Sequence, residues 1–145
     1  MSERFRLKSA VHLLLMRADE ILLLRRCNTG YEDGNYSVIA GHLEGGEPVK
    51  HAMIREAREE AGIEIEPTDL SVVHVMHRKS GDERIDFFLE AGHWRGEPVN
   101  REPHKCDDLR WCRVDSLPSN TVAYVRRAID NVRRGVTFDS FGWEG

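Results

Sequence analysis

Five glutamates and two arginines are concentrated in one short stretch, GHLEGGEPVKHAMIREAREEAGI, which runs from residue 41 to residue 63. Within it, Glu56, Glu59 and Glu60 are spaced i, i+3 and i+4, so a helix would place their carboxylates on one face. Three like charges at this spacing destabilise a helix unless a cation neutralises them. Hard divalent cations such as Mg²⁺ or Mn²⁺ prefer oxygen ligands, which carboxylates beside a glycine-rich loop provide. The stretch therefore suits metal-assisted attack of water on a phosphate chain.

The first arginine of this stretch supports the same interpretation. Arg55 precedes Glu59 by four residues, so its guanidinium can hold that carboxylate, and Glu47 is within reach of the same group. In such a site the metal ions neutralise phosphates while a positioned carboxylate takes a proton from water. The alternative is a solvated acidic face relieved by Arg55 and Arg58, because charge runs are common on exposed helices.

These carboxylates need a helix to position them, and the sequence predicts one from Pro48 to Ala61. Proline suits the first helical turn, and Gly62 suits a position just past the last turn. Apolar residues recur at every fourth position, which indicates a stripe that faces a core. The stripe consists of Val49, Met53, Ala57 and Ala61.

Apolar and β-branched runs predict short strands on both sides of this helix. KSAVHLLLMRADEILLLRR contains two strands around a turn at RADE, and a short strand follows at residues 36–40. LSVVHVMHR and RIDFFLEAGHW form strands separated by the turn KSGDE, and LRWCRV forms another. A final amphipathic helix follows LPSN. The tail TFDSFGWEG either stays loosely ordered or folds back on its aromatic residues.

The overall composition limits the functional classes. A length of 145 residues fits one domain, 1–145, and a net charge of −4 gives no basic field for a nucleic-acid polymer. No run of about twenty apolar residues exists, and MSERFRLK lacks the apolar core of a signal peptide, so we expect no membrane partner. Cys27, Cys106 and Cys112 are odd in number and form no CxxC pair, which argues against disulfides and zinc. We expect a cytoplasmic protein.

The acidic stretch is similar to the complete signature of the Nudix hydrolases, Gx5Ex7REUxEExGU, in which U is an aliphatic residue. Gly41, Glu47 and residues 55–63 supply every fixed letter, and Ala57 is a small residue at the first aliphatic position. The resemblance implies an α/β fold, an α/β/α sandwich with a mixed β-sheet between helices, which agrees with the predicted order of elements. It also implies cleavage of nucleoside diphosphates linked to another moiety.

The resemblance assigns roles within the signature. Glu56, Glu59 and Glu60 are matched to metal-binding carboxylates for Mg²⁺ or Mn²⁺. The carbonyl of Ala40 is matched to a further metal ligand, and Gly41 is expected to allow the turn that exposes it. The supporting catalytic pair is Glu47 and Arg55.

A further acidic residue is matched outside the signature. WRGEPVNRE, residues 94–102, resembles the segment of MutT-type members that ends in an additional metal-ligating glutamate and candidate general base. That residue is Glu102 here, and Asp107 and Asp108 are substitutes if Glu102 only solvates a loop. Glu59 is the alternative base, as in other family branches.

Six residues are candidates for substrate binding. Arg26 resembles a phosphate-contacting arginine, and Arg84 can approach from the neighbouring hairpin. Asn120 matches a base-reading asparagine, although an asparagine before an amphipathic helix is also an expected N-cap. The remaining residues are His42, which either touches phosphate or closes the loop, and Tyr31 and Tyr36, which lie where a base can stack.

The resemblance favours a nucleoside triphosphate, including an oxidised or non-standard one, cleaved to the monophosphate and pyrophosphate. Markers of the ADP-ribose and diadenosine-polyphosphate branches are missing, because Arg78, Lys79 and Ser80 occupy the expected neighbourhood. Two alternatives stay open. One is another nucleoside diphosphate-linked substrate, namely a nucleotide-sugar, a dinucleoside polyphosphate or a capped RNA end. The other is a non-catalytic nucleotide-sensing module. Family members often form homodimers, so the resemblance implies that a homodimer is possible for this chain.

Overall fold

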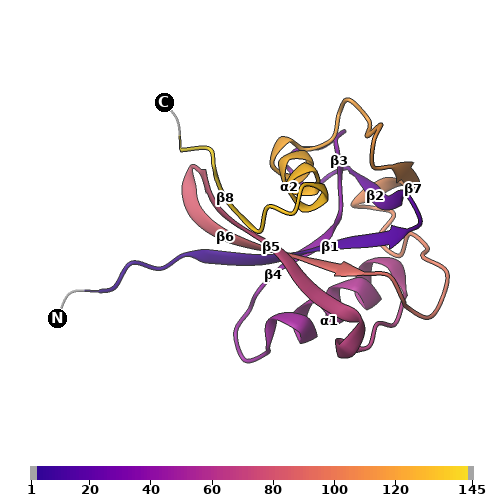
Figure 1. The fold of residues 1–145 in the computed structure, drawn as a ribbon, viewed down its shortest axis with the longest axis horizontal. Helices are drawn as coiled ribbons and strands as arrows, with labels where there is room; N and C mark the ends of the chain where they lie inside the picture. Colours follow the sequence, from indigo (N-terminus) through magenta and orange to yellow (C-terminus); the bar gives the residue numbers. More distant parts are fainter. Residues whose placement is uncertain (1–2, 144–145) are drawn as a thin grey trace.

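The computed structural model describes residues 3–143, in which a mixed β-sheet lies between helix α1 (Val49–Ala61) and helix α2 (Ala123–Arg133) (Figure 1). This arrangement confirms the predicted α/β/α sandwich. The strands and the single 3₁₀ helix are β1 (Lys8–Arg17), β2 (Glu20–Arg26), β3 (Tyr36–Ser37), β4 (Ile39–His42), η1 (Pro67–Asp69), β5 (Leu70–Ser80), β6 (Asp82–Ala91), β7 (Cys106–Arg113) and β8 (Phe138–Phe141).

Strand β1 is the centre of the sheet. Along one side it pairs in parallel with β6, which pairs antiparallel with β5, and β5 in turn pairs in parallel with β8. Along its other side, residues 10–13 pair with β4, whereas residues 16–17 pair with β2. β2 also pairs with β3 and β7. β4 and β2 therefore diverge from the same edge of β1, and the candidate site described below lies between them.

The alternating pattern of β1 divides the core into two layers, because successive side chains of a strand point to opposite faces. Val11, Leu13 and Leu15 pack in the cluster that includes the buried face of α1. Leu14 packs in the second cluster, with Val125 and other residues of α2. Each fully buried aliphatic side chain contributes about 1.5–3 kcal/mol, so the two layers fix β1 firmly between the helices.

Helix α1 confirms the prediction from the sequence. It begins at Val49, after Pro48, and ends at Gly62, which adopts a left-handed φ of 69° and donates its N–H to the Arg58 carbonyl. A glycine takes this conformation without a steric penalty. Of the predicted stripe, the last three residues are fully buried and the first is only partly buried. Burial of this stripe leaves the glutamates of α1 on its other faces, toward β4 and solvent.

Two details differ from the expected strands, and the C-terminal tail follows one of its two expected courses. The predicted strand at residues 36–40 is divided at Val38, because β3 pairs with β2 whereas β4 pairs with β1. The strand predicted from residue 84 to 94 ends at Ala91. The C-terminal tail folds back, since β8 pairs with β5 and the Trp143 indole donates to the His77 carbonyl. Over residues 3–143, no helix is long and apolar enough to span a membrane.

Candidate active site

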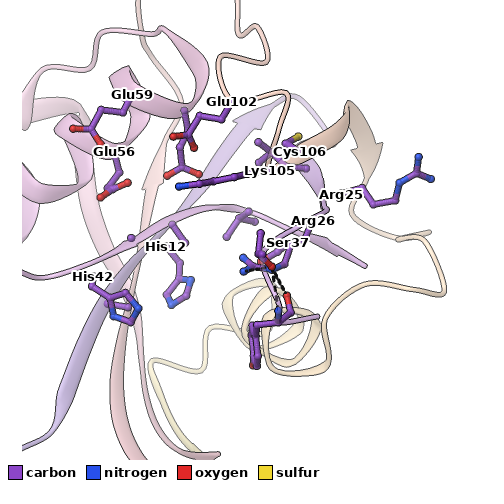
Figure 2. A pocket seen from close by; sticks show the side chains of 18 of the residues that line it. His12, Arg25, Arg26, Ser37, His42, Glu56, Glu59, Glu102, Lys105 and Cys106 are labelled. Atoms are coloured by element: carbon purple, nitrogen blue, oxygen red, sulfur yellow. Dashed lines mark hydrogen bonds between the residues drawn. The ribbon is translucent and has the colours of Figure 1, made fainter. Parts of the chain in front are cut away.

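A cavity of about 740 Å³ opens where β4 and β2 separate, and it brings the acidic face of α1 opposite arginines from the sheet. Figure 2 shows the carboxylates of Glu56, Glu59 and Glu102 near one another at one end, with His12 and His42 at a distance from them. Ten of the residues predicted from the sequence line this cavity. They are Arg26, Tyr31, Ala40, His42, Arg55, Glu56, Glu59, Glu60, Arg84 and Glu102.

Arg55 organises the acidic end. Its guanidinium donates to Glu47 at 2.7 Å and to Glu56 at 2.9 Å, and it lies 3.5 Å from Glu59. The Arg55 hydrogen bonds lower the pKa of the Glu47 carboxyl below its ordinary value, and the same contacts raise the pKa of Arg55. Glu47 does not itself line the cavity, so its effect on the cavity wall is transmitted through Arg55.

Gly41 is required for close packing rather than for a turn. We expected it to allow the turn that exposes the Ala40 carbonyl, but Gly41 lies within β4 and its φ is not left-handed. A Cβ at this position would lie 2.1 Å from Cδ of Glu56 and 2.2 Å from its Oε1. The missing side chain therefore provides the space in which the Glu56 carboxylate sits.

Glu60 is the most deeply placed carboxylate of the cluster. Burial raises its pKa well above the ordinary value, the nearby Glu56 and Glu102 raise it further, and the backbone of Ala40 opposes the shift. Its Oε2 is buried and has no hydrogen-bond partner among the described residues. A buried polar atom normally has a hydrogen-bond or ionic partner, which Oε2 of Glu60 lacks. A bound cation would be such a partner.

Glu102 is brought to the cluster by the end of α1. The last carbonyls of a helix have no partner within the helix. Here the Val99 N–H donates to the Ala61 carbonyl, and the Arg101 N–H donates to the Glu60 carbonyl. The Asn100 side chain then accepts from the Glu102 N–H at 3.0 Å. These bonds fix the segment beside α1 and turn Glu102 into the cavity.

The substitutes considered for Glu102 do not line the cavity. Asp107 pairs with Arg25 at 2.7 Å, and Figure 2 shows Arg25 pointing away from the other labelled side chains. Asp108 accepts hydrogen bonds from Tyr36 and from Arg110. These two hydrogen bonds and the positive charge of Arg110 lower the pKa of the Asp108 carboxyl. Both carboxylates are therefore engaged in surface contacts on β7.

The arginines expected to bind substrate also line the cavity. Arg26 holds the loop after β2, because its Nε donates to the Tyr31 carbonyl at 2.7 Å and its Nη2 donates to Thr29. Tyr31 is 43% exposed, with its ring 5.4 Å from the Arg26 guanidinium. Arg84 bonds Asp82 at 2.9 Å on the neighbouring hairpin. Tyr31 is therefore available for stacking, beside an arginine that keeps its loop in place.

Two residues expected to contact the base lie outside the cavity. Tyr36 is only 4% exposed, and its hydroxyl bonds Asp108. Asn120 donates to the Gly34 carbonyl at 2.8 Å and so links the loop after β2 to the start of α2. Asn120 is also not the N-cap, because α2 begins at Ala123 and is preceded by Val122. Both side chains have structural partners in place of a nucleobase.

Sequence reasoning missed Lys105. It is exposed, lines the cavity, and lies close to Glu102 in Figure 2. Its N–H donates to the Glu102 carbonyl and its own carbonyl accepts from the Cys27 N–H, so the backbone is fixed from both sides. Among residues 3–143, the Lys105 ammonium has no carboxylate within 4 Å. The only signal in the sequence was its position three residues after Glu102.

The carboxylates do not form a ready metal site in this arrangement. Over the described residues, no group of three His, Cys, Asp or Glu side chains is arranged to hold an ion. Arg55 contacts both Glu56 and Glu59, so its guanidinium already engages these two carboxylates. The donor chemistry still fits a hard cation, since the buried oxygen of Glu60 has no partner.

Comparisons with known proteins identify relatives of this chain. Residues 6–132 match the NUDIX domain family model. NAD-capped RNA hydrolase NudC of Stutzerimonas stutzeri (strain A1501) is 32% identical over 114 residues, which cover 79% of this chain but 39% of that protein. The chain thus spans about two fifths of the curated relatives it matches.

Solved structures provide a second comparison. The crystal structure of MutT NUDIX hydrolase from Burkholderia pseudomallei has a TM-score of 0.80 and 26% identity, covering 87% of this chain and 98% of that one. The MutT protein from Methanosarcina mazei Go1 has a TM-score of 0.77 at 19% identity, covering 92% and 97% of the two chains, which shows a common fold.

Proposed function

Since this chain belongs to the Nudix hydrolase family, we propose that it hydrolyses a nucleoside triphosphate to the monophosphate and pyrophosphate with the help of Mg²⁺ or Mn²⁺. The observation that carries this proposal is the cavity itself, in which a carboxylate cluster stands opposite arginines and an exposed tyrosine. An acidic end suits cations that accompany a polyphosphate, and the opposite wall suits phosphate oxygens and a base.

The carboxylates of α1 would hold the metal ions together with Glu102 and the Ala40 carbonyl. Divalent ions there would supply charge neutralisation for the phosphates and acidify a bound water. Arg55 keeps Glu47 and Glu56 oriented, as its short hydrogen bonds indicate. Family members typically use divalent metals, and the unpartnered Oε2 of Glu60 supports the same requirement here.

Glu59 is the proton acceptor that we propose for the attacking water. Its side chain is 53% exposed and is held only at 3.5 Å by Arg55. Glu56 is engaged by Arg55 at 2.9 Å, and Glu60 is buried. A general base must reach the water and be free to take its proton. Among the three carboxylates of α1, Glu59 best meets both conditions.

A second candidate substrate is favoured by the sequence comparison. The curated relatives are named for hydrolysis of NAD-capped RNA, so a nucleoside diphosphate-linked compound or a capped RNA end is the alternative. We favour the triphosphate, because the fold matches a MutT NUDIX hydrolase structure with a TM-score of 0.80 at 26% identity. We also propose a single domain, a cytoplasmic location and the capacity to form a homodimer.

A substrate panel tests the proposed function directly. Canonical and oxidised nucleoside triphosphates, nucleotide-sugars, dinucleoside polyphosphates and NAD-capped RNA are incubated with Mg²⁺ and assayed for the released phosphates. We expect pyrophosphate from at least one triphosphate, with loss of activity when EDTA removes the metal. Activity confined to a diphosphate-linked compound would establish the second candidate. Inactivity on every compound would contradict both and favour a nucleotide-sensing module.

Lys105 is expected to contribute to binding of the phosphate chain. In Lys105→Ala, we predict that KM rises roughly tenfold, because a charge-assisted hydrogen bond to a phosphate oxygen is lost. Lys105→Arg should retain most of the affinity, since it keeps the charge. The matched control is Lys50→Ala, because the Lys50 ammonium donates to the Pro67 carbonyl outside the cavity. Steady-state kinetics at saturating Mg²⁺ measure the effect, and an unchanged KM in Lys105→Ala would contradict this role.

A further inference from the structure

The loop after β2, residues 27–35, contributes Asn28, Thr29 and Tyr31 to the wall of the cavity. Every second residue from 28 to 34 has a left-handed φ, namely Asn28 (56°), Gly30 (82°), Glu32 (55°) and Gly34 (88°). Glycine adopts this conformation freely, but it is strained for a side chain as large as glutamate. Contacts within the loop must therefore hold this backbone in place.

Asp33 supplies these contacts. Its carboxylate accepts hydrogen bonds from the Thr29 N–H at 3.1 Å and from the Gly30 N–H at 2.8 Å, and the Thr29 hydroxyl also lies within hydrogen-bond distance of it. The hydrogen bonds from the Thr29 side chain and from the two backbone groups, together with the charge of Arg26, lower the pKa of the Asp33 carboxyl. Asp33 does not line the cavity, so it is placed to act on the loop and not on a ligand.

The backbone of Tyr31 is held on both sides by neighbours of Asp33. The Tyr31 N–H donates to Oγ1 of Thr29 at 3.2 Å, and Nε of Arg26 donates to the Tyr31 carbonyl at 2.7 Å. The Thr29 hydroxyl has one proton, and an ionised carboxylate is a stronger acceptor than the Tyr31 carbonyl, which is also within reach. With its proton directed to Asp33, Oγ1 accepts from Tyr31, so Asp33 acts on Tyr31 through Thr29.

The far end of the loop is tied to the rest of the fold. The Gly34 N–H donates to the Arg26 carbonyl at 2.7 Å, and the Asn120 side chain donates to the Gly34 carbonyl at 2.8 Å. The ring of Tyr31, which is exposed at the cavity wall, is thus carried by a segment fixed at its middle and at its end. A side chain that is ordered before binding loses little conformational freedom when a ligand arrives.

We propose that Asp33 is a positioning residue that preorganises the loop after β2, so that the Tyr31 ring is a fixed stacking platform for the base of a bound nucleotide. Stacking requires only the flat face of a base, so the platform contributes to affinity for any nucleobase. This inference rests on the proposed nucleotide substrate and specifies how its base is held. It concerns binding, which is measured separately from hydrolysis.

Isothermal titration calorimetry in the presence of Mg²⁺ tests the proposal with AMP, GMP, CMP and UMP, and with pyrophosphate as a ligand that has no base. In Asp33→Ala, we expect the monophosphate that binds the wild type most tightly to bind about five- to tenfold more weakly. Pyrophosphate affinity should change less than about twofold, because nothing in pyrophosphate stacks. Asp33→Asn keeps one acceptor oxygen and should recover part of the lost affinity.

A double-mutant cycle tests whether Asp33 acts through Tyr31. Tyr31→Ala removes the ring and should weaken monophosphate binding roughly tenfold. Asp33→Ala combined with Tyr31→Ala should bind no more weakly than Tyr31→Ala alone, since a loop without the ring has no platform to position. Losses that add up in the double variant would overturn the inference, as would an equal loss of monophosphate and pyrophosphate affinity in Asp33→Ala.

The matched control is Asp115→Ala. Asp115 is also an exposed aspartate that accepts hydrogen bonds, from Arg113 and Ser116, but it lies outside the cavity, so both affinities should stay unchanged. Thermal unfolding is measured for each variant. If Asp33→Ala does not fold, Thr29→Val takes its place, because it removes the hydroxyl that links Asp33 to Tyr31, and the same selective loss is expected.

The outcomes separate this inference from the proposed function. Wild-type monophosphate affinity in folded Asp33→Ala, or in Thr29→Val in its place, would overturn the inference even if the hydrolysis panel shows pyrophosphate release. Failure of all four monophosphates to bind the wild type would overturn it as well, whatever that panel shows. A selective loss of monophosphate affinity would support the platform even if no triphosphate is hydrolysed.

Discussion

Glu59→Gln is expected to lower kcat by about two to three powers of ten, which corresponds to roughly 3–4 kcal/mol of transition-state stabilisation. Glutamine has nearly the same shape but neither accepts a proton nor carries the negative charge that a divalent cation requires. The fold should persist, because Glu59 is half exposed and its partner Arg55 keeps its shorter bonds to Glu47 and Glu56.

The measurement is single-turnover hydrolysis at saturating Mg²⁺, together with thermal unfolding of the same preparation. Glu66→Gln is the matched control, since Glu66 is an exposed glutamate whose ion pair is with Arg95 at 3.4 Å, away from the cavity. A near-normal rate in Glu59→Gln would remove Glu59 from the chemistry and would direct the search for the base to Glu102.

Gly41→Ala is expected to reduce kcat about a hundredfold with little loss of stability. The new methyl group would lie 2.1 Å from Cδ of Glu56, so that carboxylate must move and its 2.9 Å ion pair with Arg55 must change. A displacement of about 1 Å at a catalytic group is enough for an effect of this size. The flexible end of one side chain can absorb the clash, so the strand itself should remain intact.

Gly92→Ala controls for the substitution itself, because no atom lies within 4 Å of a Cβ at Gly92 and its φ is not left-handed. Comparison of kcat, KM for the substrate and the Mg²⁺ dependence separates lost chemistry from lost binding. Wild-type kcat in Gly41→Ala would mean that the position of Glu56 has no effect on the reaction, and the argument from its packing would fail.

The sequence predicted those features that depend on residues close together in the chain. The apolar residues at every fourth position, together with Gly62, located α1 to within one residue. Both the buried face of the helix and its left-handed end are determined by residues within the helix or next to it. The ion pairs of Arg55 with Glu47 and Glu59 followed from spacing in the same way. Local patterns of this kind also gave the order of strands and helices.

Features that depend on distant residues could not be predicted in this way. His12 and Asp86 are 74 residues apart, and only the parallel pairing of β1 with β6 brings them together. Tyr36 was expected to stack on a base, but it packs in the core cluster with Leu14, and its hydroxyl donates to Asp108 of β7, which the local sequence does not reveal. Lys105 enters the cavity because Cys27 fixes its carbonyl, again across a large separation.

Strand β8 has a consequence for the behaviour of the protein at high concentration. β5 would otherwise be an outer strand, with the backbone groups of residues 75–78 open to a strand of another molecule. Such edges are templates for aggregation, and β8, a strand of only four residues, takes the outer position along this part of β5. A very short edge strand offers a second molecule few backbone groups to pair with. Asp139 of β8 accepts hydrogen bonds from Arg127 and Asn131 of α2, which hold β8 in this position. The contact between α2 and the tail therefore keeps a short strand at this edge of the sheet, which limits edge-to-edge pairing between molecules.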